Sequence, residues 1–304
     1  MEKHAFLIIA HNEPRVLRVL LRLLDDPRND VFLLLDARSE KMRREFAQWR
    51  QGRGGFRLLD DPPKVFWGDI SQVQAEFRLF REAYAAGPYL CYHLLSGVDL
   101  PLCTMDALHR FFREHAGCEF VSYWDDEAAA RDVRRKVGRY HFFTRAQRKG
   151  TLRHSLLAPV NNILLALQKA LRVRRGAQGW DFRKGGNWVS VTHAFCGHLL
   201  SREGDVLRRF RHTLCPDEIF LQSVLWDSPF REKLYRRGGT ESESSLRMVD
   251  WHREGPKPYV WQGGDVPALL GSGALFARKF SARHWDAVAA VAAYVSGKEK
   301  QPLQ

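Results

Sequence analysis

The chain has few of the features that mark secreted or membrane-spanning proteins. Its 304 residues include five cysteines, an odd number, and no two of them form a C-x-x-C pair, so neither a disulfide framework nor a zinc site is indicated. No apolar run approaches the roughly 18 residues of a membrane-spanning helix, and the run Ala5–Ala10 is too short for the core of a signal peptide. We therefore expect reduced thiols in a cytosolic protein.

Common nucleotide and hydrolase motifs are also missing. The sequence holds no G-x-x-x-x-G-K-[ST] loop, no G-x-G-x-x-G after the first apolar run, no H-E-x-x-H and no G-x-S-x-G. These absences argue against P-loop NTPases, ordinary dinucleotide oxidoreductases, zinc peptidases and serine hydrolases. Neither an RNA-binding aromatic motif nor a helix-turn-helix pattern is found, so we expect no nucleic-acid partner.

Positive charge is what the sequence has in excess. Forty-eight Lys and Arg residues against 35 Asp and Glu residues give a formal net charge of +13. Such a protein attracts polyanions, anionic lipid surfaces and phosphorylated ligands. The excess gathers between about residues 131 and 183, which are either a solvated helical face or an interfacial helix resting on an anionic membrane. Apolar residues recur at helical spacing there, at Ile163, Leu164, Leu167 and Leu171.

Apolar runs alternate with amphipathic segments over the first 125 residues. The pattern predicts strands over residues 5–10, 31–35, 89–95 and 119–123, and helices over 14–24, from 39 onward, over 71–84 and over 104–115. This alternation is typical of an α/β protein with a Rossmann-type sheet flanked by helices, whose ligand crevice lies beyond the carboxyl ends of the strands. We expect a single domain over residues 1–296 and a tail over 297–304.

Six segments of the sequence together carry a resemblance to a known family. They are the opening strand with His11, the segments 34–40 and 65–102, Gly186-Asn187-Trp188, Cys215-Pro216-Asp217-Glu218 with Phe220, and 275–280. In this order they resemble the family 14 glycosyltransferases, which include the core-2 and I-branching β-1,6-N-acetylglucosaminyltransferases and the peptide O-xylosyltransferases, and the resemblance covers most of the chain. The resemblance implies a GT-A-like fold with a nucleotide-binding half over 1–125 and an acceptor and catalytic half over 126–296.

The resemblance also implies transfer from a UDP-sugar with inversion and without a metal cofactor. The turn Ser96–Asp99 agrees, because it has one carboxylate where a metal clamp uses two. A metal-dependent transferase that uses Asp99 or Asp125 and Asp126 is the alternative within enzymes. We interpret Asp125, Asp126 and Glu127 as acids at a helix N-terminus, which complement the helix dipole.

An inverting transfer needs a base for the acceptor hydroxyl, worth about 10²–10⁴-fold in rate. Glu218 is the candidate: Pro216, Asp217 and Glu218 are expected in the first turn of a helix, where backbone N–H groups favour an ionised carboxylate. It also matches the family's catalytic glutamate.

The leaving diphosphate needs fixed cations. Lys279 matches the family's phosphate-binding lysine, and either Arg253 or Lys257 is the second cation. By the same resemblance the nucleotide is bound by Asp36 near the ribose and by His11 and Trp67 at the base, although ordinary core packing explains Trp67 equally well.

On the acceptor side, Lys136, Arg139 and Tyr140 resemble a Lys-x-x-Arg-Tyr segment that contacts acceptor sugar, and Trp251 resembles a tryptophan that stacks on it. We therefore expect a cytosolic, bacterial-type enzyme, peripheral at the inner membrane face, that moves GlcNAc, or else xylose, to a glycan or lipid-linked saccharide of a surface polysaccharide. The alternative from another class is a non-catalytic module that binds nucleotides or polyanions.

Overall fold

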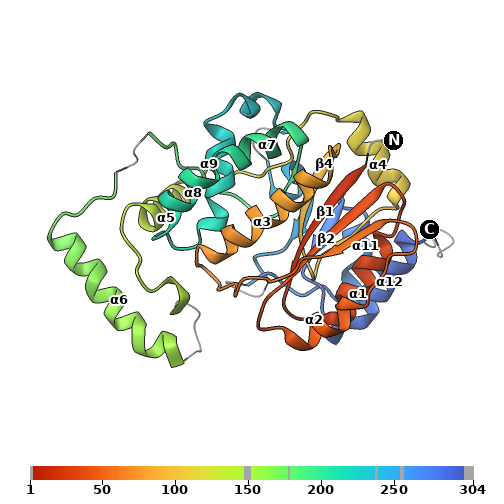
Figure 1. Ribbon diagram of the computed structural model, residues 1–304, viewed down its shortest axis with the longest axis horizontal. Helices are drawn as coiled ribbons and strands as arrows, with labels where there is room; N and C mark the ends of the chain where they lie inside the picture. The colour runs from red at the N-terminus through yellow and green to blue at the C-terminus, as the bar shows by residue number, and fades with distance from the viewer. Residues whose placement is uncertain (1–2, 147–151, 177–178, 237–238, 254–256, 298–304) are drawn as a thin grey trace.

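A five-stranded sheet forms the centre of the computed structural model, which describes residues 3–146, 152–176, 179–236, 239–253 and 257–297 (Figure 1). Its strand order is β3-β2-β1-β4-β6, and all neighbours are parallel except β4 and β6. The strands are β1 (His4–Ala10), β2 (Asn29–Leu35), β3 (Gly55–Leu58), β4 (Cys91–Ser96) and β6 (Ser190–Val191). β1, β2 and β4 are mostly apolar and nearly all of their residues are buried, as expected for parallel strands covered by helices on both faces.

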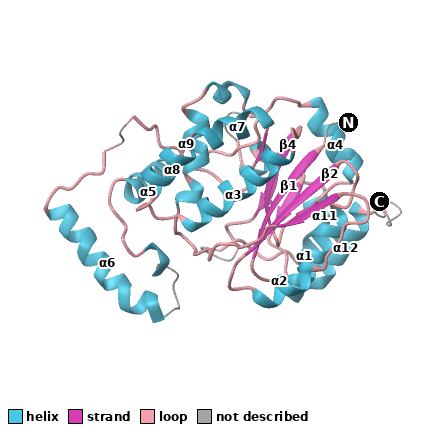
Figure 2. Cartoon of the chain, in the orientation of Figure 1, coloured by secondary structure: helices cyan, strands magenta, loops and turns pink. Residues whose placement is uncertain are grey.

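Helices cover both faces of this sheet, shown in magenta in Figure 2. One apolar core packs against α3 (Ser71–Ala86), α7 (His193–Ser201), α8 (Glu203–Phe210) and α9 (Phe220–Trp226). The other packs against α1 (Pro14–Leu23), α2 (Glu40–Ala47), α4 (Met105–Glu114), α11 (Val266–Leu270) and α12 (Trp285–Val295). The remaining helices are α5 (Glu127–Val137), α6 (Leu152–Ala170) and α10 (Glu241–Ser244).

A second, three-stranded sheet brings the C-terminal part of the chain to the carboxyl ends of the central strands. Its order is β5-β8-β7, with β5 (Leu100–Pro101), β8 (Phe276–Arg278) and β7 (Arg247–Val249). Phe280 N donates to Val98 O at 3.0 Å, and Gly97 N donates to Ile9 O at 2.9 Å. The segment after β8 therefore lies beside the turn that follows β4, near the end of β1.

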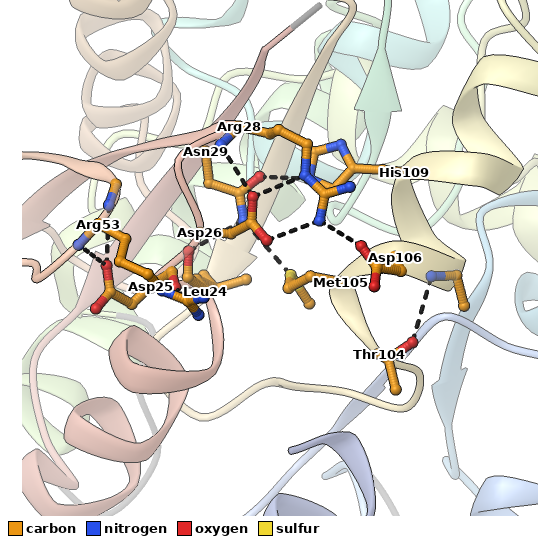
Figure 3. A network of polar contacts seen from close by, with 12 residues as sticks. Leu24, Asp25, Asp26, Arg28, Asn29, Arg53, Thr104, Met105, Asp106 and His109 are labelled. Atoms are coloured by element: carbon orange, nitrogen blue, oxygen red, sulfur yellow. Dashed lines mark hydrogen bonds and ion pairs between the residues drawn. The ribbon is translucent and has the colours of Figure 1, made fainter. Parts of the chain in front are cut away.

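A polar network at the opposite, amino end of the sheet joins the start of β2 to α4 (Figure 3). Arg28 pairs with Asp26 and with Asp106, each at 2.7 Å. Next to it, Asn29 Oδ1 lies 2.9 Å from His109 Nε2. This end of the sheet is thus stabilised by polar contacts, while the carboxyl end is left for a ligand.

The predicted α/β class, with a mixed sheet flanked by helices in one domain, is confirmed. The predicted strand over residues 119–123 is wrong: only Glu119 and Phe120 pair, in isolated bridges to Leu234 and Ser190. Both partner residues are distant in the sequence. The apolar run 119–123 alone therefore does not show that only its first two residues pair. The division at residue 125 stays a prediction, and residues 298–304 of the expected tail lie outside the described part.

All five cysteines are free, in agreement with the prediction of reduced thiols. Among the described residues, no helix combines the length and the apolar character that crossing a bilayer requires.

Candidate active site

Glu218 lies in a short turn between α8 and α9. Pro216–Glu218 form a single 3₁₀ turn, and α9 begins only at Phe220, so the expected α-helical first turn around Glu218 is wrong. Cys215, just before the turn, has a left-handed backbone (φ 46°) and donates its N–H to Gly68 O at 3.0 Å. The turn therefore lies against the loop that carries Trp67.

Two lysines hold one oxygen of Glu218. Lys136 Nζ from α5 lies 2.8 Å from Oε2 and Lys184 Nζ lies 3.2 Å from the same atom. Asp132, one turn before Lys136, binds both ammonium groups, at 2.9 and 2.6 Å. No described residue donates to Oε1, and the side chain is 28% exposed, which leaves this oxygen open to a ligand.

The electrostatics of this cluster keep Lys136 and Asp132 charged. Burial alone would lower the pKa of Lys136, but the adjacent carboxylate of Glu218 outweighs it and the pKa is raised. Burial would raise the pKa of Asp132, but hydrogen bonds from Lys184 and Lys136 lower it below its usual range. The two ammonium groups therefore stay available to orient the Glu218 side chain through its Oε2.

The neighbouring acids have a different environment. Asp217 Oδ2 accepts from Gln72 at 2.9 Å, and Glu76 Oε1 accepts from Asn187 at 3.0 Å, while the second oxygen of each has no hydrogen-bond partner among the described residues. Burial, together with the charge of Glu218, raises the pKa of Asp217 to about 7. Burial and Asp217 raise the pKa of Glu76. Of the two acids in the turn, only Glu218 is paired with cations.

Two tryptophans lie next to the lysine clamp. Lys184 Nζ stands 4.8 Å from the ring centre of Trp124, and this ring meets Trp251 edge to face, with 6.5 Å between ring centres. Trp251 is 37% exposed and donates Nε1–H to Glu241 at 3.3 Å. Exposed aromatic rings beside a carboxylate base suit the apolar C–H face of a sugar.

Glu241 connects this acceptor side to the end of β8. Burial raises the pKa of Glu241, and the negative charge of Glu218 raises it further. The hydrogen bond from Trp251 and the positive charge of Arg278 act in the opposite direction. The Glu241 carboxyl is therefore within electrostatic range of both Glu218 and Arg278. Arg278 directly precedes Lys279, the predicted phosphate ligand, and stacks on Trp188 with its guanidinium carbon 4.8 Å from the ring centre.

A hollow lies at the ends of β1 and β2, and one predicted nucleotide residue, His11, belongs to its lining. The hollow is lined by His11, Arg38, Ser39, Glu40, Lys41, Met42 and Arg44. Asp36 is buried and bonded to Arg38 of this lining: Oδ1 accepts from Arg38, and Oδ2 accepts from Arg38 and from Val65 N. The Asp36 carboxylate thus joins the end of β2 to the segment just before Trp67. Trp67 is 57% exposed, which excludes core packing as its role.

The two candidate second cations differ in their surroundings. Arg253 pairs with Asp250 at 2.5 Å and with Asp265 at 2.7 Å, and lies over the ring of Tyr259. Lys257 is exposed and makes no ion pair with a described residue. Residues 254–256 between them lie outside the described part.

The rival metal ligands have other partners. Asp99 is buried, accepts hydrogen bonds from Ser96 N and Oγ, and lies 3.3 Å from Arg278 Nε. Asp126 caps α5 by accepting from Ala129 N at 2.6 Å, as expected for a helix N-terminal acid. Within the described ranges, no group of three His, Cys, Asp or Glu residues has the arrangement of a metal site.

Of the predicted acceptor residues, the structure brings Lys136 and Trp251 to the Glu218 cluster. Tyr140 instead pairs through its backbone with Gln168 of α6 and lies under Arg175, and the predicted partner Arg139 is half-buried. Sequence reasoning missed Asp132, Lys184, Trp124 and Glu241. For Asp132 alone the sequence held a signal: it stands four residues before Lys136, and an acid and a lysine at this spacing contact each other on a helix.

Comparison with known proteins assigns the chain to a family. The family model described as Core-2/I-Branching enzyme matches residues 4–266. Xylosyltransferase 1 of Canis lupus familiaris and xylosyltransferase 2 of Homo sapiens are each 22% identical over 82% of this chain, and the match covers 24% and 27% of those proteins, so the chain spans about a quarter of their length. The apo structure of mouse xyloside xylosyltransferase 1 aligns over 91% of this chain and 97% of its own, with 10% identity and a TM-score of 0.41. The chain belongs to the Core-2/I-Branching enzyme family.

Proposed function

We propose that this chain is an inverting, metal-independent glycosyltransferase that moves a sugar from a UDP-sugar to a hydroxyl of a glycan. The observation that carries the proposal is the geometry of Glu218. Its Oε2 is bound by Lys136 and Lys184, and Lys184 also lies over the ring of Trp124, which contacts Trp251. A carboxylate base held in one orientation, with aromatic rings nearby for an acceptor sugar, is what a single displacement needs.

The proposed reaction is one displacement. The acceptor oxygen forms a bond to the anomeric carbon as the bond from that carbon to the UDP phosphate oxygen breaks, and Glu218 Oε1 takes the hydroxyl proton. The electron pair of the broken bond leaves with UDP. Lys279, with Lys257 or Arg253, then balances the charge that grows on the diphosphate, a role that a metal fills in other transferases.

Metal independence is supported by the partners of two of the three rival carboxylates. Asp99 is engaged by Ser96 and Arg278, and Asp126 caps α5. Full activity in EDTA is expected. Activity that EDTA removes and Mn²⁺ restores would instead support the metal-dependent alternative.

UDP-GlcNAc and UDP-xylose are the two donors to compare. The resemblance to the core-2 and I-branching N-acetylglucosaminyltransferases favours the first, and the names of the xylosyltransferase relatives favour the second. A thermal-shift screen of UDP-, GDP- and CMP-sugars shows which nucleotide the protein binds, because a ligand at 100 times its Kd adds about 2.7 kcal/mol to the free energy of unfolding. Stabilisation by GDP- or CMP-sugars alone would contradict the donor proposal.

The decisive experiment compares UDP release by the parent and by Glu218→Gln. We expect a loss of about 10²–10⁴-fold in turnover with UDP affinity kept, since the amide cannot take a proton. Glu127→Gln is the matched control, because Glu127 is a surface glutamate paired only with Arg131. If the parent binds UDP but releases none from either UDP-sugar in the presence of glycan acceptors, the chain is the non-catalytic binding module instead.

We further propose that the acceptor is a lipid-linked saccharide or a precursor of a bacterial surface polysaccharide, reached from the cytoplasmic side of a membrane. The free cysteines and the basic region 131–183 support this setting.

A further inference from the structure

Helix α6 stands apart from the rest of the molecule and is joined to it at both ends (Figures 1 and 2). Along one side it carries large apolar side chains spaced three or four residues apart, which we call the α6 stripe. Their exposed fractions range from 42% to 77%. The stripe consists of Leu152, Leu156, Val160, Ile163, Leu167 and, just after the helix, Leu171. Residues at this spacing lie on one face of a helix.

The opposite face of α6 is turned toward the chain. Asn161 and Gln168, seven residues apart, are buried there, and Gln168 exchanges two hydrogen bonds of 2.9 Å with the backbone of Tyr140. The inner side of the helix therefore holds these two buried polar residues together with half-buried Leu157, Leu164 and Leu165, while the outer side exposes the α6 stripe. A row of large exposed apolar side chains is the opposite of what the outer face of a water-exposed helix needs.

The charge around the stripe has one sign. Residues 133–180 include twelve Lys or Arg residues and no Asp or Glu. Exposed Lys169, Arg172 and Arg174, at the end of α6, make no ion pair with any described residue. Residues 147–151, which hold two of the twelve cations, lie outside the described part.

We propose that the α6 stripe docks the protein on an anionic lipid bilayer. An apolar helix face enters the boundary between headgroups and acyl chains, and cations beside it gain from anionic headgroups. A second copy of this chain is the less suitable occupant, because pairing two identical stripes brings their cations together without carboxylates to balance them.

Docking through α6 would orient the active site toward the bilayer. Gln168 holds Tyr140, four residues after Lys136 of the Glu218 clamp. Before α6, Thr144 Oγ1 donates to Asp69 Oδ2 at 2.7 Å, two residues after Trp67. Both ends of α6 are thus attached to segments that carry site residues, so the acceptor would be membrane-bound. This last step rests on the proposed function, whereas the docking itself does not.

Vesicle flotation tests the docking without any sugar present. The stripe variant is Ile163→Gln with Leu167→Gln, and the matched control is Asn162→Gln with Ala166→Gln, exposed positions of the same helix at the same spacing. Parent and control are expected to float with vesicles of phosphatidylglycerol and phosphatidylcholine, less so at high salt and much less with phosphatidylcholine alone. The stripe variant should bind about tenfold more weakly or worse.

Equal flotation of the stripe variant and the parent, or no flotation of the parent, would overturn the proposal. So would a parent dimer in analytical ultracentrifugation that the stripe variant abolishes, since a second copy would then cover the stripe. Glu218→Gln should float like the parent, and the stripe variant should still bind UDP. Failure of docking and failure of the transferase proposal are therefore seen separately.

Discussion

Lys136 Nζ lies 2.8 Å from Glu218 Oε2 and 2.9 Å from Asp132 Oδ2, so one buried ammonium group joins α5 to the turn before α9. Lys136 was expected to contact acceptor sugar, whereas in the structure its charge is directed at the candidate base. It therefore acts as a positioning residue for Glu218, through both its charge and its place in the fold.

Replacing Lys136 with Met should lower turnover by about tenfold or more, because it removes one of the two charged groups that hold Glu218 Oε2 in place. Lys184 remains on the same oxygen and limits the loss. Arg135→Met, which removes the adjacent cation on Asp132 but none on Glu218, is the control. Equal turnover in Lys136→Met and the parent, measured as UDP release, would show that Lys136 does not position the base.

Asp217→Asn should be tolerated in activity and should stabilise the fold at alkaline pH. Because burial raises the pKa of Asp217 to about 7, the protein binds its proton more tightly when folded. The stability that Asp217 contributes is therefore present at low pH and lost as pH rises toward and through about 7. Relative to the parent, the Asn variant should gain about 1–3 kcal/mol between about pH 5 and pH 8. Thermal unfolding of both proteins at the two pH values measures this, and a constant difference would contradict it.

The sequence predicted β1, β2, β4 and α1 to α4 because each contains an apolar run or an amphipathic repeat of ordinary length, but it missed the short strands β3 and β5. It also placed Asp36, Trp67 and the Ser96–Asp99 turn at the carboxyl ends of strands. Asp36 and the turn do follow β2 and β4, whereas Trp67 lies in the segment between β3 and α3. The contacts of Lys136 and Lys184 with Glu218 could not be predicted from the sequence. Lys136 and Lys184 belong to a long basic stretch, and only tertiary contacts distinguish two buried lysines there from the solvated ones.

His109→Gln should make the free energy of unfolding depend less on pH in the acid range. Burial, with the charge of Arg28, lowers the pKa of His109 to about 4, so its ring is neutral in the folded protein. The stability that this neutral ring contributes is present above the unfolded pKa near 6.5 and is lost as pH falls below it, by up to about 1.4 kcal/mol per pH unit. Gln keeps a donor toward Asn29 Oδ1 and has no proton to gain. The stability gap between parent and variant, from urea unfolding, should therefore narrow from about pH 7 to pH 5. His252→Gln, the same substitution at an exposed position, is the matched control.

The second phosphate cation can be assigned by comparing UDP with uridine. The Arg253 guanidinium is already shared by Asp250 and Asp265, which balance its charge, whereas exposed Lys257 makes no ion pair with a described residue. Lys257→Met should therefore weaken UDP binding by about tenfold and leave uridine binding unchanged, since a charge-assisted hydrogen bond contributes about 1.5–3 kcal/mol. Arg253→Met should mainly lower the melting temperature, because it leaves two acids unpaired. Calorimetric titration with both ligands distinguishes the two cations. A large loss of UDP affinity in Arg253→Met, with none in Lys257→Met, would reverse the assignment and mean that the ion pairs of Arg253 open when the nucleotide binds.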